Sequence, residues 1–233
     1  MSRMRLANRE LDQLILNINK PPNMSSYDVV RVVKRLLPGV KAGHAGTLDP
    51  FAEGVLLILL GKATKRMSEL LRLRKRYEAV LQLGWATTTG DPTGIPTESV
   101  PVPHLTKDQL DQVARHFKGK ILQVPPAYSA KKVAGKPAYR LARRGQPVNL
   151  APVKITIYEL ELTALDNDRL KLEVECASGT YVRRLGEDIA EALGTFGHLT
   201  SLRRTAIGDY RVEHSVTLEQ LPAFLTTLSG VAI

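Results

Sequence analysis

The sequence predicts a mixed α and β fold (α+β), because helix-like and strand-like segments alternate along its 233 residues. Apolar residues recur at helical spacing in some stretches and at every second position in others. Hydrophobic residues make up 43% of the chain, enough to build one sizeable core. No internal repeat, low-complexity tract or linker is visible, so we expect a single domain over residues 1–233.

In the first part of the chain, turn residues separate the periodic segments. Ser25 and Asp28 have the spacing of a capping box, which favours a helix start at this point. Pro21 and Pro22 end the preceding strand, since proline cannot donate to a β-ladder. The expected elements are, in order, a strand at 14–18, a helix from Ser25 to Pro38-Gly39, a polar loop at 42–54, a strand at 55–60 and a basic helix at 65–73.

In the second part, alternating apolar residues indicate half-buried strands. Two strands are expected to pair across Asp166–Asp168, and the apolar phase shifts near Tyr158, which suggests a bulge. Thr106 and the pair Thr217 and Gln220 are candidate helix caps. The expected elements are a strand at 77–83, a helix at 105–118, the two paired strands, a helix at 182–193, a mostly extended stretch at 199–212 and a final helix.

Residues 124–150 differ from their surroundings because they are basic and bounded by prolines. We interpret them as an inserted lobe with a short helix from Pro137 to Arg144, which Gly145 ends. A run of charges is usually only a solvated face, although this one also suits a polyanion. The basic residues are Lys131, Lys132, Lys136, Arg140, Arg143 and Arg144, with Tyr128 and Tyr139 between them.

The net charge of +10 and the pI of about 9.8 favour a polyanionic partner, either nucleic acid or an acidic membrane. The longest apolar run, residues 55–60, is far shorter than the roughly 20 residues that a spanning helix needs. The N-terminus lacks the apolar region of a secretory signal, so a cytoplasmic location is expected. The one cysteine, Cys176, permits no internal disulfide and makes a structural zinc site improbable.

The segment from Gly43 to Pro50, GHAGTLDP, is the most unusual in the chain. Asp followed by Pro is a common helix start, with Asp49 as the cap and Pro50 at the first helical position. A loop carboxylate is equally a candidate catalyst, because chemistry usually lies on loops held by a rigid scaffold. His44 alone is more often a hydrogen-bonded spacer than a catalyst. The residues of this segment leave both interpretations open.

Six strings, taken together, resemble one family, the bacterial tRNA pseudouridine-55 synthases of the TruB type. They keep the family's order and cover nearly all of the chain from Leu14 to Leu221. The strings are NKPPNMSS at 19–26, GHAGTLDPFAEGVL at 43–56, KRYEAVLQLG at 75–84, PPAYSAKKVAGKPAYRLARRG at 125–145, CASGTYVRRLGEDI at 176–189 and LRRTAIGDY at 202–210.

The resemblance implies a largely antiparallel sheet flanked by helices and the isomerisation of a uridine in the T-loop of tRNA. It also implies that Asp49 is the essential carboxylate. The reaction breaks the N1–C1′ bond and joins C5 to C1′ without net redox change or group transfer, so no cofactor is expected. An ionised aspartate attacks the sugar or the base, or removes a sugar proton. These routes remain open.

The same resemblance assigns roles around Asp49. Arg183 is expected to pair with Asp49. A pocket poor in water disfavours the ionised form of a lone carboxylate, and a guanidinium can stabilise it through two parallel hydrogen bonds, that is, in bidentate geometry. The ring of Tyr77 is expected against the target uracil, and its hydroxyl is a candidate for proton removal at C5. His44 is expected to fill the space that the flipped nucleotide leaves. The further candidates are Leu202 in the pocket, Lys20 as support of the catalytic loop, Tyr181 as an RNA contact, and Lys65 with Lys62 and Arg66 on the basic surface.

Longer relatives in the family carry a C-terminal RNA-binding domain, which we do not expect here, so affinity should depend more on the inserted lobe. In the family this lobe is mobile and closes on RNA. We expect tRNA as partner, no membrane, and a monomer without an obligate protein partner. Two other functions remain open: a non-catalytic RNA-binding or RNA-folding protein, for which Asp49 would be dispensable, and a synthase acting on another structured RNA.

Overall fold

The structure is a computed structural model that describes residues 11–129, 131–133 and 135–229. Residues 1–10, on which the expectation about a secretory signal depends, lie outside the described residues. The chain divides into two compact units, unit 1 with Met1–Arg76 and Arg203–Ile233, and unit 2 with Tyr77–Leu202. Within the described part of the chain, no helix is long and apolar enough to cross a membrane.

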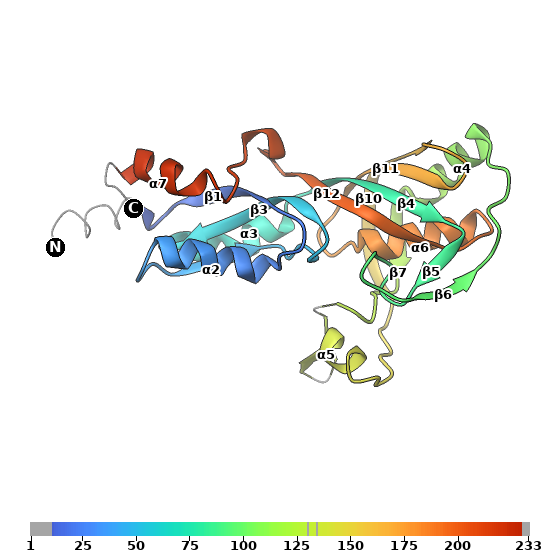
Figure 1. Ribbon diagram of the computed structural model, residues 1–233, viewed down its shortest axis with the longest axis horizontal. Coiled ribbons are helices and arrows are strands. Elements are labelled where there is room, and N and C mark those ends of the chain that lie inside the picture. Colours follow the sequence, from blue (N-terminus) through green and yellow to red (C-terminus); the bar gives the residue numbers. More distant parts are fainter. Residues whose placement is uncertain (1–10, 130, 134, 230–233) are drawn as a thin grey trace. The chain divides into compact units, whose positions relative to one another are not determined.

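Unit 1 consists of strands joined by short helices, and its elements alternate as the sequence predicts (Figure 1). The elements that lie wholly in it are β1 (Ile15–Lys20), α2 (Ser26–Leu36), β2 (Ala42–Ala45), β3 (Glu53–Leu60), the 3₁₀ helix η1 (Gly61–Arg66), α3 (Met67–Arg72), β13 (Tyr210–Arg211), the 3₁₀ helix η2 (Val212–His214) and α7 (Leu221–Ser229). Two long strands, β4 (Lys75–Leu83) and β12 (Gly197–Ile207), have residues in both units.

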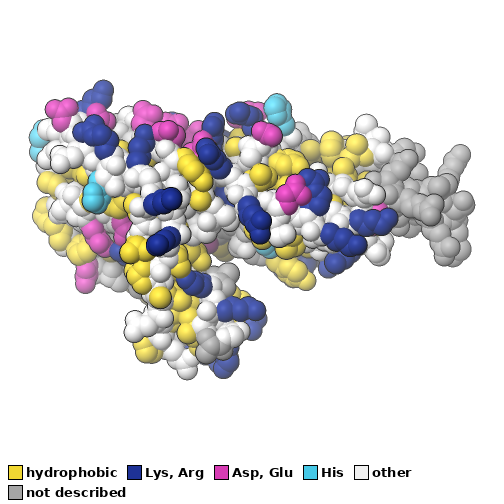
Figure 2. Space-filling view, turned by 180° about the vertical axis from the view of Figure 1, so that it is seen from behind, with side chains coloured by type: hydrophobic (Ala, Val, Ile, Leu, Met, Phe, Trp, Pro, Cys, Tyr) yellow, Lys and Arg dark blue, Asp and Glu magenta, His cyan; other side chains and the backbone are white. Residues whose placement is uncertain are grey.

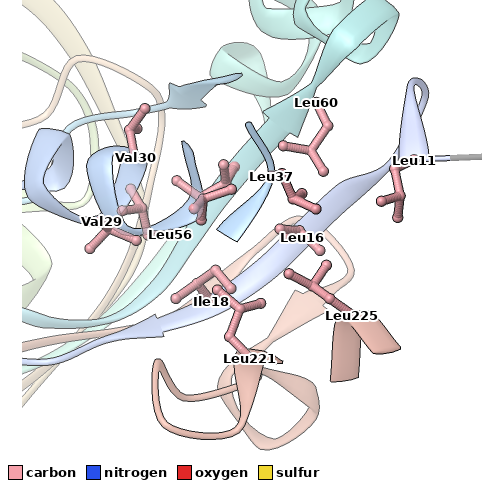
Figure 3. Packing of buried hydrophobic residues seen from close by; sticks show 12 residues of the cluster. Leu11, Leu16, Ile18, Val29, Val30, Leu37, Leu56, Leu60, Leu221 and Leu225 are labelled. Atoms are coloured by element: carbon pink, nitrogen blue, oxygen red, sulfur yellow. The ribbon is translucent and has the colours of Figure 1, made fainter. Parts of the chain in front are cut away.

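Strand β3 lies in the centre of the core of unit 1, and both of its faces are covered. Successive side chains of a strand point to opposite faces. Leu56, Ile58 and Leu60 therefore pack with α2, β1 and α7, as Figure 3 shows for the labelled leucines. Val55, Leu57 and Leu59 pack with α3 and η1 instead. A continuous apolar run is what such a doubly covered strand requires, and residues 55–60 are the longest such run in the sequence.

Helix α2 begins as predicted. Ser25 is its N-cap, and the capping box is complete because the Ser25 hydroxyl accepts from the Asp28 N–H at 3.1 Å. In return, the Asp28 carboxylate accepts from the Ser25 N–H at 2.9 Å. Two of the orphan donors at the helix start are thereby satisfied.

Unit 2 combines antiparallel strands with two longer helices. Its elements are β5 (Trp85–Thr87), β6 (Pro96–Ser99), α4 (Lys107–Phe117), β7 (Gly119–Gln123), β8 (Lys132–Val133), β9 (Lys136–Pro137), α5 (Ala138–Ala142), β10 (Val153–Ala164), β11 (Arg169–Cys176) and α6 (Val182–Ala192). The predicted hairpin is confirmed as β10 and β11, and the register shifts between Ile157 and Glu159, where the bulge was expected.

The strands of the main sheet follow the order β1-β3-β12-β4-β11-β10-β7. The pairs β1–β3, β2–β3, β7–β10, β10–β11 and β12–β13 are antiparallel, whereas β12 runs parallel to β3. The predicted fold class, a mixed α+β protein with a largely antiparallel sheet and flanking helices, is confirmed. The prediction of a single domain stays a prediction.

The basic lobe is inserted between two neighbouring antiparallel strands. Its chain leaves β7 after Gln123 and returns at the start of β10, where Gln123 and Val153 face each other in the register. Figure 1 shows the lobe standing apart from the strands of unit 2, with α5 inside it. Both ends of the lobe therefore meet at one point, which we call the lobe root, residues Gln123 and Val153.

Two of the expected elements are wrong. Residues 42–54 were expected to be a loop, but Ala42–Ala45 form β2, which pairs with residues 57–60 of β3. The composition of residues 42–45 does not favour a strand. Hydrogen bonding to the available edge of β3 outweighs this weak propensity. The basic helix expected at 65–73 is two pieces, because η1 continues to Arg66 before α3 begins at Met67.

Candidate active site

Asp49 lies in unit 1, on the loop of residues 46–52 between β2 and β3, and is partly buried. No helix begins at Asp49 and Pro50, because the chain passes from the loop directly into β3 at Glu53. The interpretation of Asp49 as a helix cap is therefore wrong. The residue stands on an irregular segment, so what holds this segment decides how firmly the carboxylate is placed.

Arg204 on β12 holds the beginning of this loop. Its side chain is almost completely buried, with 1% of its surface exposed. The guanidinium donates to the carbonyls of Val55 at 2.7 Å, Gly46 at 3.0 Å and Thr47 at 3.4 Å. A planar group with five donors in a fixed fork is suited to binding several carbonyls at once. It thus joins the loop to the first residues of β3.

Two further buried side chains hold the residues on either side of Asp49. The Ser26 hydroxyl accepts from the Leu48 N–H at 2.8 Å and donates to the Leu48 carbonyl at 3.1 Å. Lys20 donates from Nζ to the carbonyl of Pro50 at 3.2 Å and to that of Met24 at 2.7 Å. Both neighbours of Asp49 are therefore fixed by groups outside the loop.

The ammonium of Lys20 is a buried charge, and this changes its acidity. Burial lowers the pKa of Lys20 to about 8, and the negative charge of Asp49 offsets part of this effect. Through its bond to Pro50, Lys20 holds the loop that carries Asp49, and its expected role as support of a catalytic loop stays a prediction.

Close packing of β3 against β12 explains a glycine of the GHAGTLDPFAEGVL string. Gly54 has φ of +101°, and a Cβ at this position would lie 2.3 Å from the carbonyl oxygen of Arg204. Gly54 is also the register partner of Arg204 in the parallel pair. Only glycine permits this backbone and this approach, so it allows β12 to bring Arg204 against the loop.

His44 lies on β2, opposite Ile58 of β3. Burial lowers the pKa of His44, and the nearby guanidinium of Arg204 lowers it further. The imidazole is therefore mostly neutral near pH 7. Within the described residues, no hydrogen-bond partner is found for its buried Nδ1. A neutral planar ring suits the stacking role predicted for His44, which stays a prediction.

Arg183 lies in unit 2, in the first turn of α6, and only 4% of its surface is exposed. It forms an ion pair with Asp91, in which Nη1 and the carboxylate oxygen are 3.3 Å apart. The same guanidinium donates to the carbonyl of Thr89 at 2.6 Å and to that of Tyr128 at 3.0 Å. The Tyr128 carbonyl belongs to the lobe, so Arg183 connects α6 with the lobe.

Asp91 is itself fixed by the turn that contains it. Its carboxylate accepts from the Thr89 hydroxyl at 2.7 Å and from the Thr93 N–H at 2.9 Å. An acceptor held by several donors has a fixed position. The turn therefore presents a fixed negative group to Arg183.

Tyr181 is the N-cap of α6, and Gln123 at the lobe root holds its backbone. The Gln123 amide donates from Nε2 to the Tyr181 carbonyl at 3.1 Å and accepts at Oε1 from the Tyr181 N–H at 2.9 Å. Tyr77 on β4 and Leu202 on β12 are buried, with 9% and 6% of their surfaces exposed. Their predicted contacts with the uracil stay predictions.

The basic residues of the lobe are mostly accessible. Figure 2 shows Lys and Arg side chains gathered on the lobe around α5. Lys132, Arg143 and Arg144 are exposed, Lys131 is half-buried, and the Arg143 guanidinium carbon lies 5.6 Å from the centre of the Tyr139 ring. On η1, Lys62, Lys65 and Arg66 are exposed.

The predicted site residues thus gather in two groups, each within one unit. Lys20, His44 and Asp49 belong to unit 1, and Tyr128, Tyr181 and Arg183 belong to unit 2. The predicted pair of Asp49 and Arg183 would join the units and stays a prediction. Among the described residues, no group of three or more His, Cys, Asp or Glu could hold a metal ion.

Four residues that hold the site were not identified from the sequence: Ser26, Asp91, Gln123 and Arg204. Only Arg204 left a usable signal. It shares a face of its strand with Leu202 and Ala206, and an arginine in an apolar phase indicates a buried cation.

Two family models match adjoining parts of the chain. Residues 34–182 match the model described as TruB family pseudouridylate synthase, N-terminal domain. Residues 183–229 match the model described as tRNA pseudouridylate synthase B C-terminal domain. Together the matches cover the segments that carry the site, apart from β1 and residues 21–33, which include most of α2.

Curated relatives named tRNA pseudouridine synthase B are similar over most of both chains. The relative from Caldanaerobacter subterraneus subsp. tengcongensis is 47% identical over 208 residues, which are 89% of this chain and 73% of the relative. The relative from Hydrogenovibrio crunogenus is 47% identical over 213 residues, which are 91% of this chain and 70% of the relative.

Solved structures are similar at lower identity. A chain in the crystal structure of a Cbf5-Nop10-Gar1 complex matches with a TM-score of 0.74 and 28% identity, over 97% of this chain and 59% of that one. A chain in the structure of an H/ACA RNP bound to a substrate RNA containing 2′-deoxyuridine matches with a TM-score of 0.70 and 27% identity, over 96% and 57%. The chain therefore spans less than six tenths of the length of these two solved chains.

Proposed function

Because the chain belongs to the TruB family of pseudouridylate synthases, we propose that it isomerises a uridine in the T-loop of tRNA to pseudouridine, with Asp49 as the essential carboxylate. The reaction breaks the N1–C1′ bond, turns the uracil and forms the C5–C1′ bond. All atoms of the substrate remain in the product. The protein therefore needs to supply a nucleophile or a general base, a pocket in which the uracil can turn, and residues that bind the RNA.

The observation that carries the proposal is how the loop around Asp49 is held. Backbone groups of Gly46, Thr47, Leu48 and Pro50 are bound by three buried side chains that lie outside the loop, Arg204, Ser26 and Lys20. Fixing an irregular segment this completely costs conformational entropy. Such an arrangement suits a reactive group that must meet its substrate in one geometry.

We assign to Arg183 the role of cationic partner of the Asp49 carboxylate. Two features support this assignment. The guanidinium is always charged, and it lies in the first turn of the eleven-residue helix α6, where the helix dipole also favours an anion. With Asp91 and two carbonyls on it, the guanidinium has a fixed orientation.

Of the remaining candidates, Tyr77 keeps a catalytic role in this proposal, with its hydroxyl as the candidate for proton removal at C5, and the others belong to RNA recognition. The buried Tyr77 ring stacks on the target uracil, Leu202 lines the pocket, and the neutral His44 ring takes the space of the flipped nucleotide. The exposed cations of the lobe bind phosphates, and Tyr128 and Tyr181 lie at its base. A splayed-out loop nucleotide is the form in which RNA bases are usually read.

We propose that the chain acts as a monomer and that the reaction takes place in the cytoplasm, where tRNA is modified. Sedimentation of the purified chain, alone and with tRNA, measures its oligomeric state. A monomer that is fully active is the expected result. Activity that depends on a second protein would contradict this part of the proposal.

The test of the function is to incubate the purified chain with unmodified tRNA and to map pseudouridine by position, without added metal or nucleotide. We expect one pseudouridine in the T-loop. Two further samples separate the alternatives: a tRNA whose T-loop uridine is replaced by cytidine, and a structured RNA of another class. Modification of the second RNA alone would show another substrate, and no modification of any RNA would favour the non-catalytic function.

A further inference from the structure

At the lobe root, the Gln123 side chain is in an unusual position. It is a polar group with 1% of its surface exposed, on the last residue of β7, directly before the lobe. Its two hydrogen bonds both go to the backbone of Tyr181, one to the N–H and one to the carbonyl. The amide thus replaces one rung of a β-ladder between β7 and the segment that leads into α6.

The segment that Gln123 binds carries Arg183 two residues later. At the start of a helix the first backbone N–H groups have no partner within the helix, so the entry of the chain into the helix is fixed from outside. For α6 the N-cap Tyr181 makes no side-chain cap hydrogen bond. Besides the helix bond from the Leu185 N–H to the Tyr181 carbonyl, the Gln123 amide binds both backbone groups of the N-cap residue, and it thereby helps to set the direction in which the Arg183 side chain leaves the helix.

The lobe reaches Arg183 by a second route. The Tyr128 carbonyl, five residues after Gln123, accepts from Nη2 of Arg183 at 3.0 Å. One end of the lobe thus binds the guanidinium while its root binds the backbone of the same helix turn. A displacement of the root would change both contacts together.

We propose that Gln123 is a positioning residue for the isomerisation: by pairing with both backbone groups of Tyr181, its amide holds α6 to the lobe root and so sets the orientation of the Arg183 guanidinium. This inference rests on the catalytic role proposed for Arg183. It makes the rate of turnover depend on Gln123 without any contact of this residue to RNA. It also couples the position of the lobe to the group that is expected to balance the charge of Asp49.

The test compares Gln123→Met, which keeps the length and approximate volume of the side chain, with Gln82→Met. Gln82 is a matched control because it is also a buried glutamine of unit 2, 8% exposed, whose amide binds the carbonyls of Leu83 and Asp168. Both variants lose a buried amide. We expect both to lower the melting temperature, and only Gln123→Met to lower kcat, by about ten-fold or more.

Three readouts separate positioning from a general loss of stability. For Gln123→Met, KM and the Kd for tRNA should stay within about two-fold of the wild type while kcat falls. In an Arg183→Lys background, the same substitution should have little further effect on the single-turnover rate, because the two changes act through one group. The Nε–Hε NMR signal of Arg183, assigned by its loss in Arg183→Lys, should shift in Gln123→Met and not in Gln82→Met.

An unshifted Arg183 signal in Gln123→Met overturns the proposal whatever the activity. So does an equal loss of kcat in Gln123→Met and Gln82→Met, or a rate loss that multiplies independently with that of Arg183→Lys. Failure of the proposed function looks different. In that case the wild type forms no pseudouridine in tRNA, and the NMR signal alone then decides whether Gln123 orients Arg183.

Discussion

Asp49 and Arg183 are placed by two different kinds of structure. Asp49 stands on a loop without regular hydrogen bonding, and side chains from β1, α2 and β12 hold the backbone around it. Arg183 stands on a helix whose own backbone is regular, and its charged group is held by Asp91 and two carbonyls. Around Asp49, buried polar side chains from other elements fix the position of the backbone. In α6 the backbone is fixed by the helix itself, and the partners fix the orientation of the Arg183 side chain.

The two regions nevertheless share one device. Ser26 pairs with both the N–H and the carbonyl of Leu48, directly before Asp49. Gln123 pairs with both backbone groups of Tyr181, shortly before Arg183. In each case a single buried polar side chain fixes one residue beside the functional one. In both regions the backbone beside the predicted site residue is thus held by a buried side chain that comes from another element.

The largest effect on stability is expected in the helix region. Asp91→Asn removes the charge opposite Arg183 in a pair whose side chains are 7% and 5% exposed. Removing one partner of a buried ion pair is strongly destabilising, so we expect a loss of up to about 3–5 kcal/mol in the free energy of unfolding, reduced by whatever the proposed pairing of Arg183 with Asp49 retains. Urea denaturation measures this. The double variant Asp91→Leu with Arg183→Met should recover most of that stability while remaining inactive, and a double variant no more stable than Asp91→Asn would contradict the account.

In the loop region, Lys20 makes stability depend on pH. Its pKa in the folded protein, about 8, lies below the ordinary value of 10.5, because burial disfavours the charged form. Between these two values the unfolded chain binds more protons at this site, so its contribution to stability rises with pH. Relative to Lys20→Met, the wild type should gain on the order of 1 kcal/mol between about pH 7 and pH 9. Stability curves that stay parallel over this range would exclude a depressed pKa at Lys20.

Two adjacent serines allow a sharper test of the loop. Ser26→Ala removes both hydrogen bonds to Leu48, and Ser25→Ala removes the cap of α2. Each change should lower the free energy of unfolding by about 1 kcal/mol. Only Ser26→Ala should also lower kcat, since only Ser26 holds the residue before Asp49. Equal kcat values for the two variants would show that the loop needs no such support.

The smallest effect on stability is expected for the exposed arginines of the lobe. Replacing Arg143 and Arg144 by Gln should leave the free energy of unfolding within about 0.5 kcal/mol. The slope of log Kd for tRNA against log salt concentration should become shallower by about 1 to 2, if both contact phosphate. The pair Lys34 and Arg35, at the end of α2, provides a control with the same charge change. An unchanged slope in the lobe variant would remove these residues from the RNA contact.

Local rules predicted much of the fold. The capping box at Ser25 and Asp28, the doubly buried run of β3 and the bulge between Ile157 and Glu159 each follow from residues close together in the sequence. Strand β2 does not, since Ala42 to Ala45 become a strand only because β3 offers an edge. Short segments with weak propensity take their conformation from distant partners.

The candidate site was predicted in the same uneven way. The motif residues Asp49, Arg183 and Lys20 were identified through the resemblance, whereas most of their supports were not. Asp91 reads in the sequence as an ordinary turn residue, and Gln123 as a polar strand end. Their function depends on what faces them across 92 and 58 positions of sequence, from Asp91 to Arg183 and from Gln123 to Tyr181. A single sequence carries no local sign of such pairing.

The central claim is that the carboxylate at position 49 performs the isomerisation. It is tested most directly by the single-turnover rate of Asp49→Asn on unmodified tRNA, with tRNA binding measured in the same samples. Asparagine has nearly the same shape and lacks the negative charge. The account predicts no pseudouridine above background, with Kd for tRNA within about two-fold of the wild type. Pseudouridine formed at the wild-type rate by this variant would contradict it.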